Sequence, residues 1–324
     1  MLAVFSMIQV LSVGALSSVE ATSSPATVNE FLVIADMPYT PIDTANLTAG
    51  GILAKKITQT PHGFLMHLGD IKAGSQPCAD ELLKRNKQLL TGLTEQPFIY
   101  TPGDNEWTDC DRENLQPRFD ELERLTFIKN LMYSTEYQQR AKQLTGYKTQ
   151  PEMRENARWQ FAGVEFMTLH IPGTHNGRRQ VLLTDKAQAN NAAAQRDERN
   201  LAWLAAADPE AKGYVIGFQA DIYSHGTSQS ACSATVVSNC DGFKVYRDAI
   251  AQFAKMVAKP VLVMHGDTGP NCQQQLSDNL TRLNAPGDYM VSDIARVAIQ
   301  AHEGSVSWHI SSLKTAEPLT RECR

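Results

Sequence analysis

Short apolar runs along this chain alternate with longer segments in which apolar and charged residues are mixed. Runs rich in Val, Ile, Leu and Phe are typical of buried strands, and the mixed segments are typical of amphipathic helices. Four of the runs share a further feature, because each passes directly into a stretch that contains an acidic residue. These runs are FLVIADMPY (31–39), FLMHLGDIK (64–72), FIYTPGDNEW (98–107) and VLVMHGDTG (261–269).

The rest of the chain predicts helices and further strands between these runs. Predicted helices cover 44–58, 79–90, 116–133, 137–144, 185–207 and 243–257. A long strand or a hairpin is predicted over 159–173, and a strand over 214–221. The alternating segments 295–302 and 305–312 predict an antiparallel hairpin at a sheet edge. Buried strands that alternate with helices predict one α/β domain over 29–324, a layered α/β sandwich with central mixed sheets flanked by helices.

Asp36, Asp70, Asp104 and Asp267 each follow the end of a predicted strand. In open α/β sheets, the carboxyl ends of the strands are where ligands bind. Taken singly, each Asp could be a turn residue or a helix cap. Four such endings favour convergence at one edge, and because neighbouring carboxylates repel one another, we expect a divalent cation among them.

The net charge of the chain indicates its kind of binding partner, and the N-terminal residues indicate its cellular compartment. Acidic and basic residues are intermixed and sum to a net charge of -5, so we expect a small-molecule partner, not nucleic acid or a membrane surface. Residues 1–21 form an apolar stretch that ends in a sequence resembling a signal-peptidase site, although no Lys or Arg precedes the apolar core. We expect an export signal, a linker at 22–28, and a secreted or periplasmic protein. An uncleaved anchor, a truncated start or a disordered tail are the alternatives.

The cysteines, six in number, agree with an oxidising compartment. Sequence alone does not fix their connectivity. Proximity along the chain suggests the pairs Cys78–Cys110, Cys232–Cys240 and Cys272–Cys323. Since no CxxC spacing occurs, we expect neither a redox motif nor a structural zinc site.

The ordered series of acidic loops resembles the calcineurin-like metallophosphoesterase superfamily, which includes the purple acid phosphatases. That family shows DxH, GDxx, GNH[DE], a lone His after a strand, and GHxH, in this order. The counterparts here are Asp36-Met37-Pro38, Gly69-Asp70, Gly103-Asp104-Asn105-Glu106, Gln219 and Gly266-Asp267-Thr268-Gly269. The resemblance implies a metallophosphoesterase-like sandwich that acts on phosphate esters.

The resemblance also implies two metal positions of unequal quality. The counterparts of the first are Asp36, Pro38, Asp70 and Gly269, of which the Pro and the Gly have no side-chain donor. The counterparts of the second are Asp70, Asp104, Gln219 and Asp267, which are all oxygen donors. Oxygen ligands suit Mn²⁺, Mg²⁺ or Ca²⁺ better than Zn²⁺, so we expect one or two hard divalent ions.

Further residues are expected to handle the substrate. Asn105 stands where the family has a catalytic His, and an amide donates a hydrogen bond but does not deliver a proton near neutral pH. His265 is the expected substitute, although in a register shifted by one residue it would be a metal ligand. Tyr39 and Lys72 are expected to hold an anionic group over the metal, with packing and solvation as their alternative roles. Asn176 is a further candidate for contact with the substrate.

Together, these features imply an exported phosphoesterase in which a metal polarises a phosphoryl oxygen and activates a water molecule. Phosphate monoesters or nucleotide-like substrates are expected ahead of diesters. The missing family histidines suggest the alternative, a catalytically silent phosphoesterase fold that binds a ligand, a metal or a protein partner.

Overall fold

The computed structural model describes residues 2, 28–224, 229–289 and 292–323. The expected export signal at 1–21 and nearly all of the expected linker lie outside this part of the chain. Within the described residues, no helix is both long and apolar enough to cross a membrane.

Two mixed sheets lie at the centre of the molecule. The first has the order β12 (Ser305–Ser312), β11 (Ala295–His302), β1 (Glu30–Ile34), β2 (Leu65–His67) and β3 (Phe98–Tyr100). The second has the order β4 (Thr145–Gln150), β5 (Met153–Phe161), β6 (Val164–Thr168), β7 (Tyr214–Gly217), β8 (Val261–His265), β10 (Leu280–Asn284) and β9 (Cys272–Ser277). Strands β1, β2 and β3 run parallel to one another, as do β6, β7, β8 and β10. Their carboxyl ends therefore meet at one edge of each sheet.

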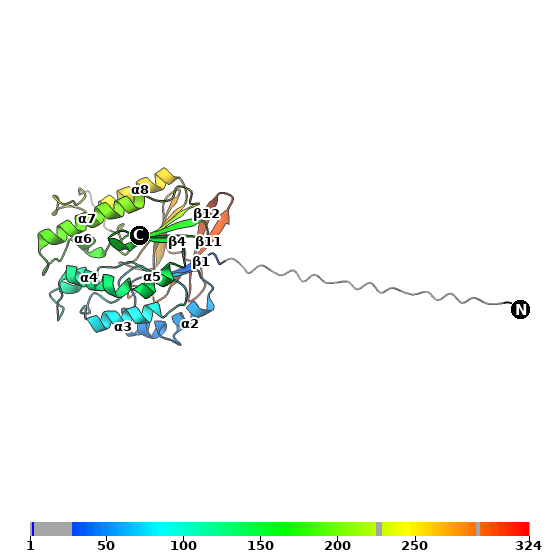
Figure 1. Cartoon of the computed structure of the whole chain (residues 1–324), viewed down its shortest axis with the longest axis horizontal. Helices are drawn as coiled ribbons and strands as arrows, with labels where there is room; N and C mark the ends of the chain where they lie inside the picture. The colour runs from blue at the N-terminus through cyan, green and yellow to red at the C-terminus, as the bar shows by residue number, and fades with distance from the viewer. Residues whose placement is uncertain (1, 3–27, 225–228, 290–291, 324) are drawn as a thin grey trace.

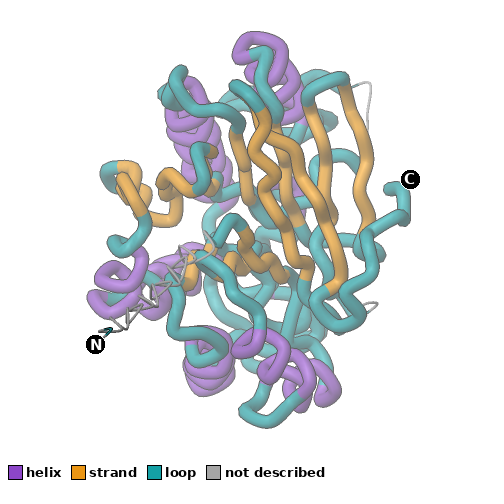
Figure 2. Tube along the Cα trace, turned by 90° about the vertical axis from the view of Figure 1, so that its right-hand side faces the viewer, coloured by secondary structure: helices purple, strands orange, loops and turns teal. Residues whose placement is uncertain are grey.

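Helices cover the outer side of each sheet. Near the first sheet lie α1 (Pro41–Leu47), α2 (Ile52–Gln59), α3 (Asp80–Thr91), α4 (Glu121–Met132) and α5 (Thr135–Ala141). The second sheet is covered by α7 (Lys186–Ala205) and α8 (Lys244–Val257), which lie opposite α2 and α3 in Figure 1. Figure 2 shows the strands between helices at the top and the bottom of the molecule. The predicted layered α/β sandwich is confirmed.

Both faces of the second sheet are buried, which explains its unbroken apolar runs. Phe166 points toward the first sheet, where its ring centroid lies 5.0 Å from that of Phe31. The next residue, Met167, belongs instead to the apolar cluster shared with α7 and α8. A strand covered on both faces needs apolar residues at successive positions. Such runs are the strand signal that the sequence analysis used.

Several boundaries differ from the prediction. The predicted helix at 44–58 is two helices, α1 and α2, because Gly50 between them has a φ of 89°, which ends the helical path. Strands β4, β9 and β10 were not predicted, since polar sequences such as Cys272–Ser277 carry no apolar alternation. The predicted terminal hairpin is confirmed as β11 and β12, with β12 at the sheet edge.

The three disulfides suggested by proximity are confirmed. Cys78 pairs with Cys110, Cys232 with Cys240, and Cys272 with Cys323. The first joins the loop after β2 to the short helix η1 (Thr108–Asp111), which follows β3. It therefore links two of the loops that carry the acidic residues.

Candidate metal centre

Acidic residues from both sheets converge at the carboxyl ends of the parallel strands. Asp70 and Asp104 follow β2 and β3 of the first sheet, and Asp267 follows β8 of the second. One carboxylate oxygen from each of these three residues lies within 4.8 Å of the others. The three residues line a cleft of about 250 Å³. Asp36, which follows β1, is buried beside them and does not line the cleft.

The backbone of these loops is shaped to hold the carboxylates close together. Asp36, Asp70 and Asp267 have φ values of 52°, 61° and 77°, in the left-handed region that Asp adopts more readily than most residues. At Gly103, an added Cβ would lie 1.9 Å from Asp70 Oδ1, so this contact requires glycine. Unusual backbone conformations often cluster at functional sites. Here they place the carboxylates of Asp36, Asp70 and Asp267 near one another.

Asp70 is held by hydrogen bonds from three different loops. Its Oδ2 accepts from the hydroxyl of Tyr39 at 2.8 Å and from Asn105 Nδ2 at 2.9 Å. Gln219 Nε2 donates to the same oxygen at 3.1 Å, and the backbone N–H of Asn105 donates to Oδ1 at 3.0 Å. Tyr39 and Asn105, both predicted site residues, thus lie in the cleft and fix the carboxylate of Asp70.

Gln219, predicted as a metal ligand, lies in the site but presents its amide nitrogen to the carboxylates. Its Oε1 accepts a hydrogen bond of 2.5 Å from the backbone N–H of Gly173. A flipped amide would set two donors against each other at this contact, so the orientation is fixed by Gly173. In this arrangement Gln219 donates hydrogen bonds to the acidic cluster and does not offer it an oxygen.

A left-handed turn brings a hydroxyl to the acidic cluster. Three consecutive residues of α6 (Gly173–Gly177), Thr174, His175 and Asn176, have φ values of 48°, 59° and 59°. Thr174 Oγ1 lies 2.5 Å from Asp104 Oδ2 and 2.7 Å from Asp109 Oδ1. The turn thereby joins the second sheet to the loop after β3.

Asn176, predicted to contact the substrate, instead joins this turn to α7. It is fully buried, and its Nδ2 donates to Asp197 at 2.6 Å. Its backbone carbonyl accepts from Arg196 at 2.7 Å. These contacts with α7 hold the strained backbone in place, and Asn176 does not line the cleft.

Burial and mutual repulsion make the acidic cluster costly to ionise. Burial, followed by the charge of Asp267, raises the pKa of Asp104 to about 7, and burial raises the pKa of Asp267 to about 6. The pKa of Asp70 is raised well above its usual value by burial and then by the charge of Asp104. A divalent cation would offset this repulsion. Three carboxylates fit a hard cation such as Mg²⁺, Mn²⁺ or Ca²⁺.

Arg112 is a cleft residue that the sequence analysis missed. Among the described residues that line the cleft, it is the only cationic one. Its guanidinium forms an ion pair with Asp109, and its Nε donates to Gln180 Oε1 at 3.1 Å. Arg112 directly follows η1 and not a strand, so no apolar run in the sequence points to it. The spacing of Asp109 and Arg112 within one short helical turn was the available signal.

Lys72 and His265, both predicted to act at the site, do not line the cleft. The Lys72 ammonium is buried and donates to the backbone carbonyls of Ala73 and Gln76, at 3.1 and 2.8 Å. Burial lowers its pKa to about 8. His265 is also buried, and its Nε2 accepts a 2.8 Å hydrogen bond from Arg282. Burial lowers the pKa of His265 to about 4, so its ring is neutral near neutral pH.

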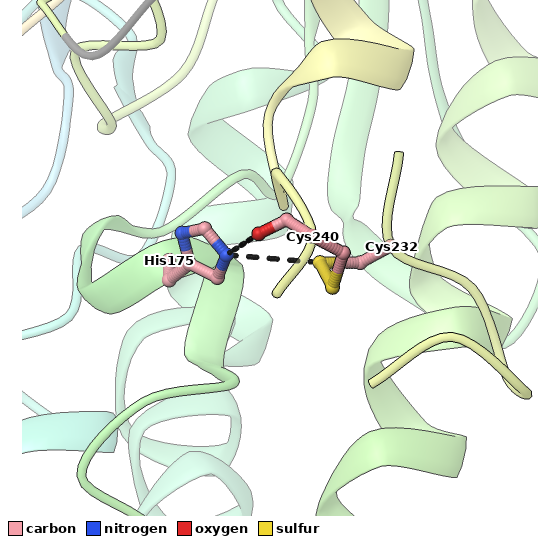
Figure 3. A group of neighbouring side chains, drawn as sticks. All are labelled: His175, Cys232 and Cys240. Carbon is pink, nitrogen blue, oxygen red and sulfur yellow. Dashed lines mark hydrogen bonds between the residues drawn. A yellow bond between two sulfur atoms is a disulfide. The ribbon is translucent and has the colours of Figure 1, made fainter. Parts of the chain in front are cut away.

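A second group of metal-binding residue types lies around His175 (Figure 3). His175 Nε2 lies 3.6 Å from Cys232 Sγ and 2.8 Å from the carbonyl oxygen of Cys240. Cys232 and Cys240 form a disulfide, so neither provides a thiolate, which is the form that binds a metal. This group is a histidine packed on a disulfide loop.

Comparisons with known proteins find similarity at the level of the fold. No family model and no curated protein matches the chain. A dimetal phosphatase from Danio rerio is similar, with a TM-score of 0.51 and 11% identity, over 90% of this chain and 98% of that chain. This similarity in fold extends over nearly the whole of both chains, and it agrees with the predicted architecture.

Two further solved structures have lower TM-scores. GAP50, the anchor in the inner membrane complex of Plasmodium, has a TM-score of 0.45 and 11% identity, over 90% of this chain and 89% of that chain. A 5'-nucleotidase from Candida albicans has a TM-score of 0.46 and 8% identity, over 89% of this chain and 52% of that chain.

Proposed function

We propose that this chain, whose fold is that of the metallophosphoesterases, is an exported phosphoesterase with a divalent cation held by Asp70, Asp104 and Asp267. The observation that carries the proposal is the convergence of these three carboxylates, which line one cleft. When bound there, the cation would polarise a phosphoryl oxygen and lower the pKa of a water molecule. Mg²⁺, Mn²⁺ or Ca²⁺ suits this oxygen-only set of ligands.

The protein residues around this cation would bind and orient the substrate. Arg112, which lines the same cleft, would pair with the negative charge of a phosphoryl group, for which a guanidinium is well suited. Asn105, Gln219 and Thr174 would hold the carboxylates in position through their hydrogen bonds. Positioning of this kind is a large part of phosphoryl-transfer catalysis.

The proposed substrate is a small phosphate ester whose leaving group departs without help from an imidazole. None of the residues that line the described cleft is a histidine, and Asn105 cannot deliver a proton near neutral pH. Aryl phosphates, and nucleoside di- or triphosphates cleaved at a phosphoanhydride bond, have leaving groups that need less protonation than an alkoxide. We therefore expect faster turnover of these substrates than of alkyl phosphates.

The proposed export is supported by the chemistry of the cysteines. All three pairs form disulfides, which persist in oxidising compartments such as the periplasm or the extracellular space. The test is to express the full chain and determine the N-terminal sequence of the mature protein in the secreted or periplasmic fraction. Retention of the whole protein in the reducing cytoplasm, with free thiols, would contradict export.

The activity is tested with the full chain, purified from an oxidising compartment, stripped of metal and reloaded with Mn²⁺. We expect Mn²⁺-dependent hydrolysis of aryl phosphates and nucleotides, which Asp70→Asn should lower by about 100-fold or more. The matched control is Asp248→Asn on the exposed side of α8, which should keep full activity. If reloaded protein hydrolyses no ester of a broad panel, the proposed activity is wrong.

A second function, cation or phosphate binding without turnover, is favoured by one observation. Both amide side chains next to Asp70 donate to its carboxylate, so they tie down the ligand and supply no acid or base. In that case, the chain would bind Mn²⁺ and inorganic phosphate, and neither reloaded protein nor Asp70→Asn would show turnover. Calorimetry with Mn²⁺ and phosphate, run beside the activity assay, distinguishes the two functions.

A further inference from the structure

The hydroxyl of Tyr39 lies between two buried carboxylates. It is 2.8 Å from Asp70 Oδ2 and 3.2 Å from Asp36 Oδ1, and it accepts a 2.6 Å hydrogen bond from Asn105 Nδ2. The side chains of Tyr39, Asp36, Asp70 and Asn105 are all buried. A neutral hydroxyl thus occupies the space between Asp36 and Asp70, where a cation shared by the two carboxylates would otherwise lie.

The backbone lies close to both carboxylate oxygens of Asp36. Both of its oxygens accept from the backbone N–H of Asp267, at 3.2 and 3.0 Å. The backbone also closes on it from a second direction, since a Cβ added to Gly266 would lie 2.2 Å from Asp36 Oδ2. Asp36 does not line the cleft, whereas Asp70, Asp104 and Asp267 do.

Two positions next to Asp36 and Asp267 carry no side-chain donor. Two residues after Asp36 stands Pro38, and two residues after Asp267 stands Gly269, and neither has a side-chain oxygen or nitrogen. The imidazole of His67 lies on a neighbouring strand, but its Nε2 is 2.9 Å from the carbonyl oxygen of Met37. Asp288, whose charge also acts on Asp36, has an Oδ2 that accepts a 3.1 Å hydrogen bond from the N–H of Gly269. A cation between Asp36 and Asp70 would therefore have to displace hydrogen bonds that both carboxylates already make.

We propose that the Tyr39 hydroxyl takes the place of a second cation, so that the chain binds one divalent ion and Asp36 is not a ligand. This inference rests on the proposed metal centre at Asp70, Asp104 and Asp267. Hydrogen bonds to charged acceptors are stronger than neutral ones, so the single proton of the Tyr39 hydroxyl, donated to one carboxylate at a time, offsets part of their repulsion. Asp36 then serves as a positioning residue, because it holds the backbone N–H of the ligand Asp267.

The number of ions is tested on the metal-free full chain by calorimetric titration with Mn²⁺, together with the electron paramagnetic resonance spectrum of the loaded protein. We expect one Mn²⁺ per chain and the six-line spectrum of an isolated ion. Two ions with an exchange-coupled spectrum would overturn the inference while leaving the proposed function intact. No Mn²⁺ binding at all would overturn the metal centre itself, and the inference with it.

Substitutions separate a ligand from a positioning residue. Asp36→Asn keeps an acceptor for the N–H of Asp267, so the chain should still bind one ion, with an affinity lowered by less than about 100-fold, the upper end for loss of an outer contact. Asp104→Asn removes a proposed ligand, and the affinity should fall by more than about 100-fold, beyond the loss expected for an outer contact. A loss of more than about 100-fold in Asp36→Asn would make Asp36 a ligand and overturn the inference.

Tyr39 itself is tested by opening the space that its side chain fills. A folded Tyr39→Ala chain should take up a second Mn²⁺, since the carboxylates of Asp36 and Asp70 lose their shared hydroxyl. The matched control is Tyr289→Ala, which removes a ring packed 4.9 Å from that of Tyr39 but leaves the hydroxyl in place. The control should bind one ion. A folded Tyr39→Ala chain that also binds only one would overturn the role given to Tyr39.

Discussion

Thr174 Oγ1 lies 2.5 Å from Asp104 Oδ2, and this contact joins the two sheets of the molecule at the acidic cluster. Thr174 belongs to the turn after β6 in the second sheet, whereas Asp104 follows β3 in the first. Neither sheet by itself contains the site. The packing of the sheets against each other therefore sets the spacing of the carboxylates.

Thr174→Val should weaken metal binding without unfolding the protein. The substitution keeps the side-chain shape but removes the hydroxyl that orients Asp104, and the loss of such an outer contact typically costs about 10- to 100-fold in metal affinity. Calorimetric titration with Mn²⁺ measures the change. Thr174→Ser is the matched control, because it retains the hydroxyl, and it should bind within a few-fold of the wild type. Equal affinities of the Val and Ser variants would contradict this role.

Arg112→Met should raise the KM for phosphate esters. The guanidinium is the cationic group among the described residues lining the cleft, and a hydrogen bond to a charged group contributes about 1.5–3 kcal/mol, or about 10- to 100-fold in kcat/KM. Steady-state kinetics on an aryl phosphate provide the measurement. Arg118→Met, at an exposed position nearby, should leave kcat/KM unchanged. An unchanged KM in Arg112→Met would exclude contact between this residue and the phosphate.

Mn²⁺ should stabilise the protein more at pH 8 than at pH 5. The folded-state pKa values of Asp104 and Asp267 are about 7 and about 6, above the value of about 3.9 for Asp in an unfolded chain. Their contribution to the stability of the metal-free protein is fully present below about pH 4 and is lost as the pH rises through the folded pKa values. An ion that binds the ionised carboxylates offsets this loss, and protons compete with it at low pH.

Thermal unfolding with and without Mn²⁺ at several pH values measures this effect. Saturating Mn²⁺ should raise Tm by about 5 °C at pH 8 and by clearly less at pH 5. The difference between loaded and metal-free protein is the correct readout. Burial lowers the pKa of His67, His170 and His265 to about 4. As the pH falls below the pKa of these histidines in the unfolded chain, they therefore destabilise the metal-free and the Mn²⁺-loaded protein alike. A gain in Tm that grows toward pH 5 would contradict the prediction.

Removal of the Cys78–Cys110 disulfide should lower both stability and metal affinity. A loop of this length, with the cysteines 32 residues apart, corresponds to about 3–4 kcal/mol in the free energy of unfolding. Cys110 lies in η1 beside Asp109, so the acidic loop would loosen as well. Replacing Cys272 and Cys323 by Ala is the matched control, which should cost similar stability but leave Mn²⁺ affinity unchanged. Urea unfolding of both double variants measures the loss of stability, and Mn²⁺ titration measures the change in metal affinity.

The acidic cluster could be predicted in part because its members follow strands that are recognisable in the sequence as apolar runs. Strands such as the one before Asp36 are buried on both faces, so their sequences are continuous apolar stretches. An Asp directly after a parallel strand then has one place to go, the carboxyl edge of the sheet. The strands β9 and β10 escaped prediction because their partly polar residues take their strand conformation from pairing with each other and with β8.

The direction of individual side chains could not be predicted in the same way. Gln219 was expected to offer its oxygen to a metal, but a backbone N–H that is 46 residues away in the chain turns its nitrogen toward the carboxylates. His265 and Lys72 stand at the expected positions in the sequence, yet Arg282 and nearby carbonyls bind their polar atoms away from the cleft. Arg112 lines the cleft from a segment whose sequence has no helix-like or strand-like pattern of apolar residues.

By itself, the sequence determined the layered sandwich and the edge at which the carboxylates gather, and it suggested the cysteine pairs that the structure then fixed. The sandwich and the edge follow from local patterns, since apolar runs and strand ends are properties of neighbouring residues. The tertiary structure alone decided which polar atoms face the cleft and that Tyr39 lies between Asp36 and Asp70. A hydrogen bond depends on distances of a few tenths of an ångström between distant segments, and only the packed chain fixes those distances.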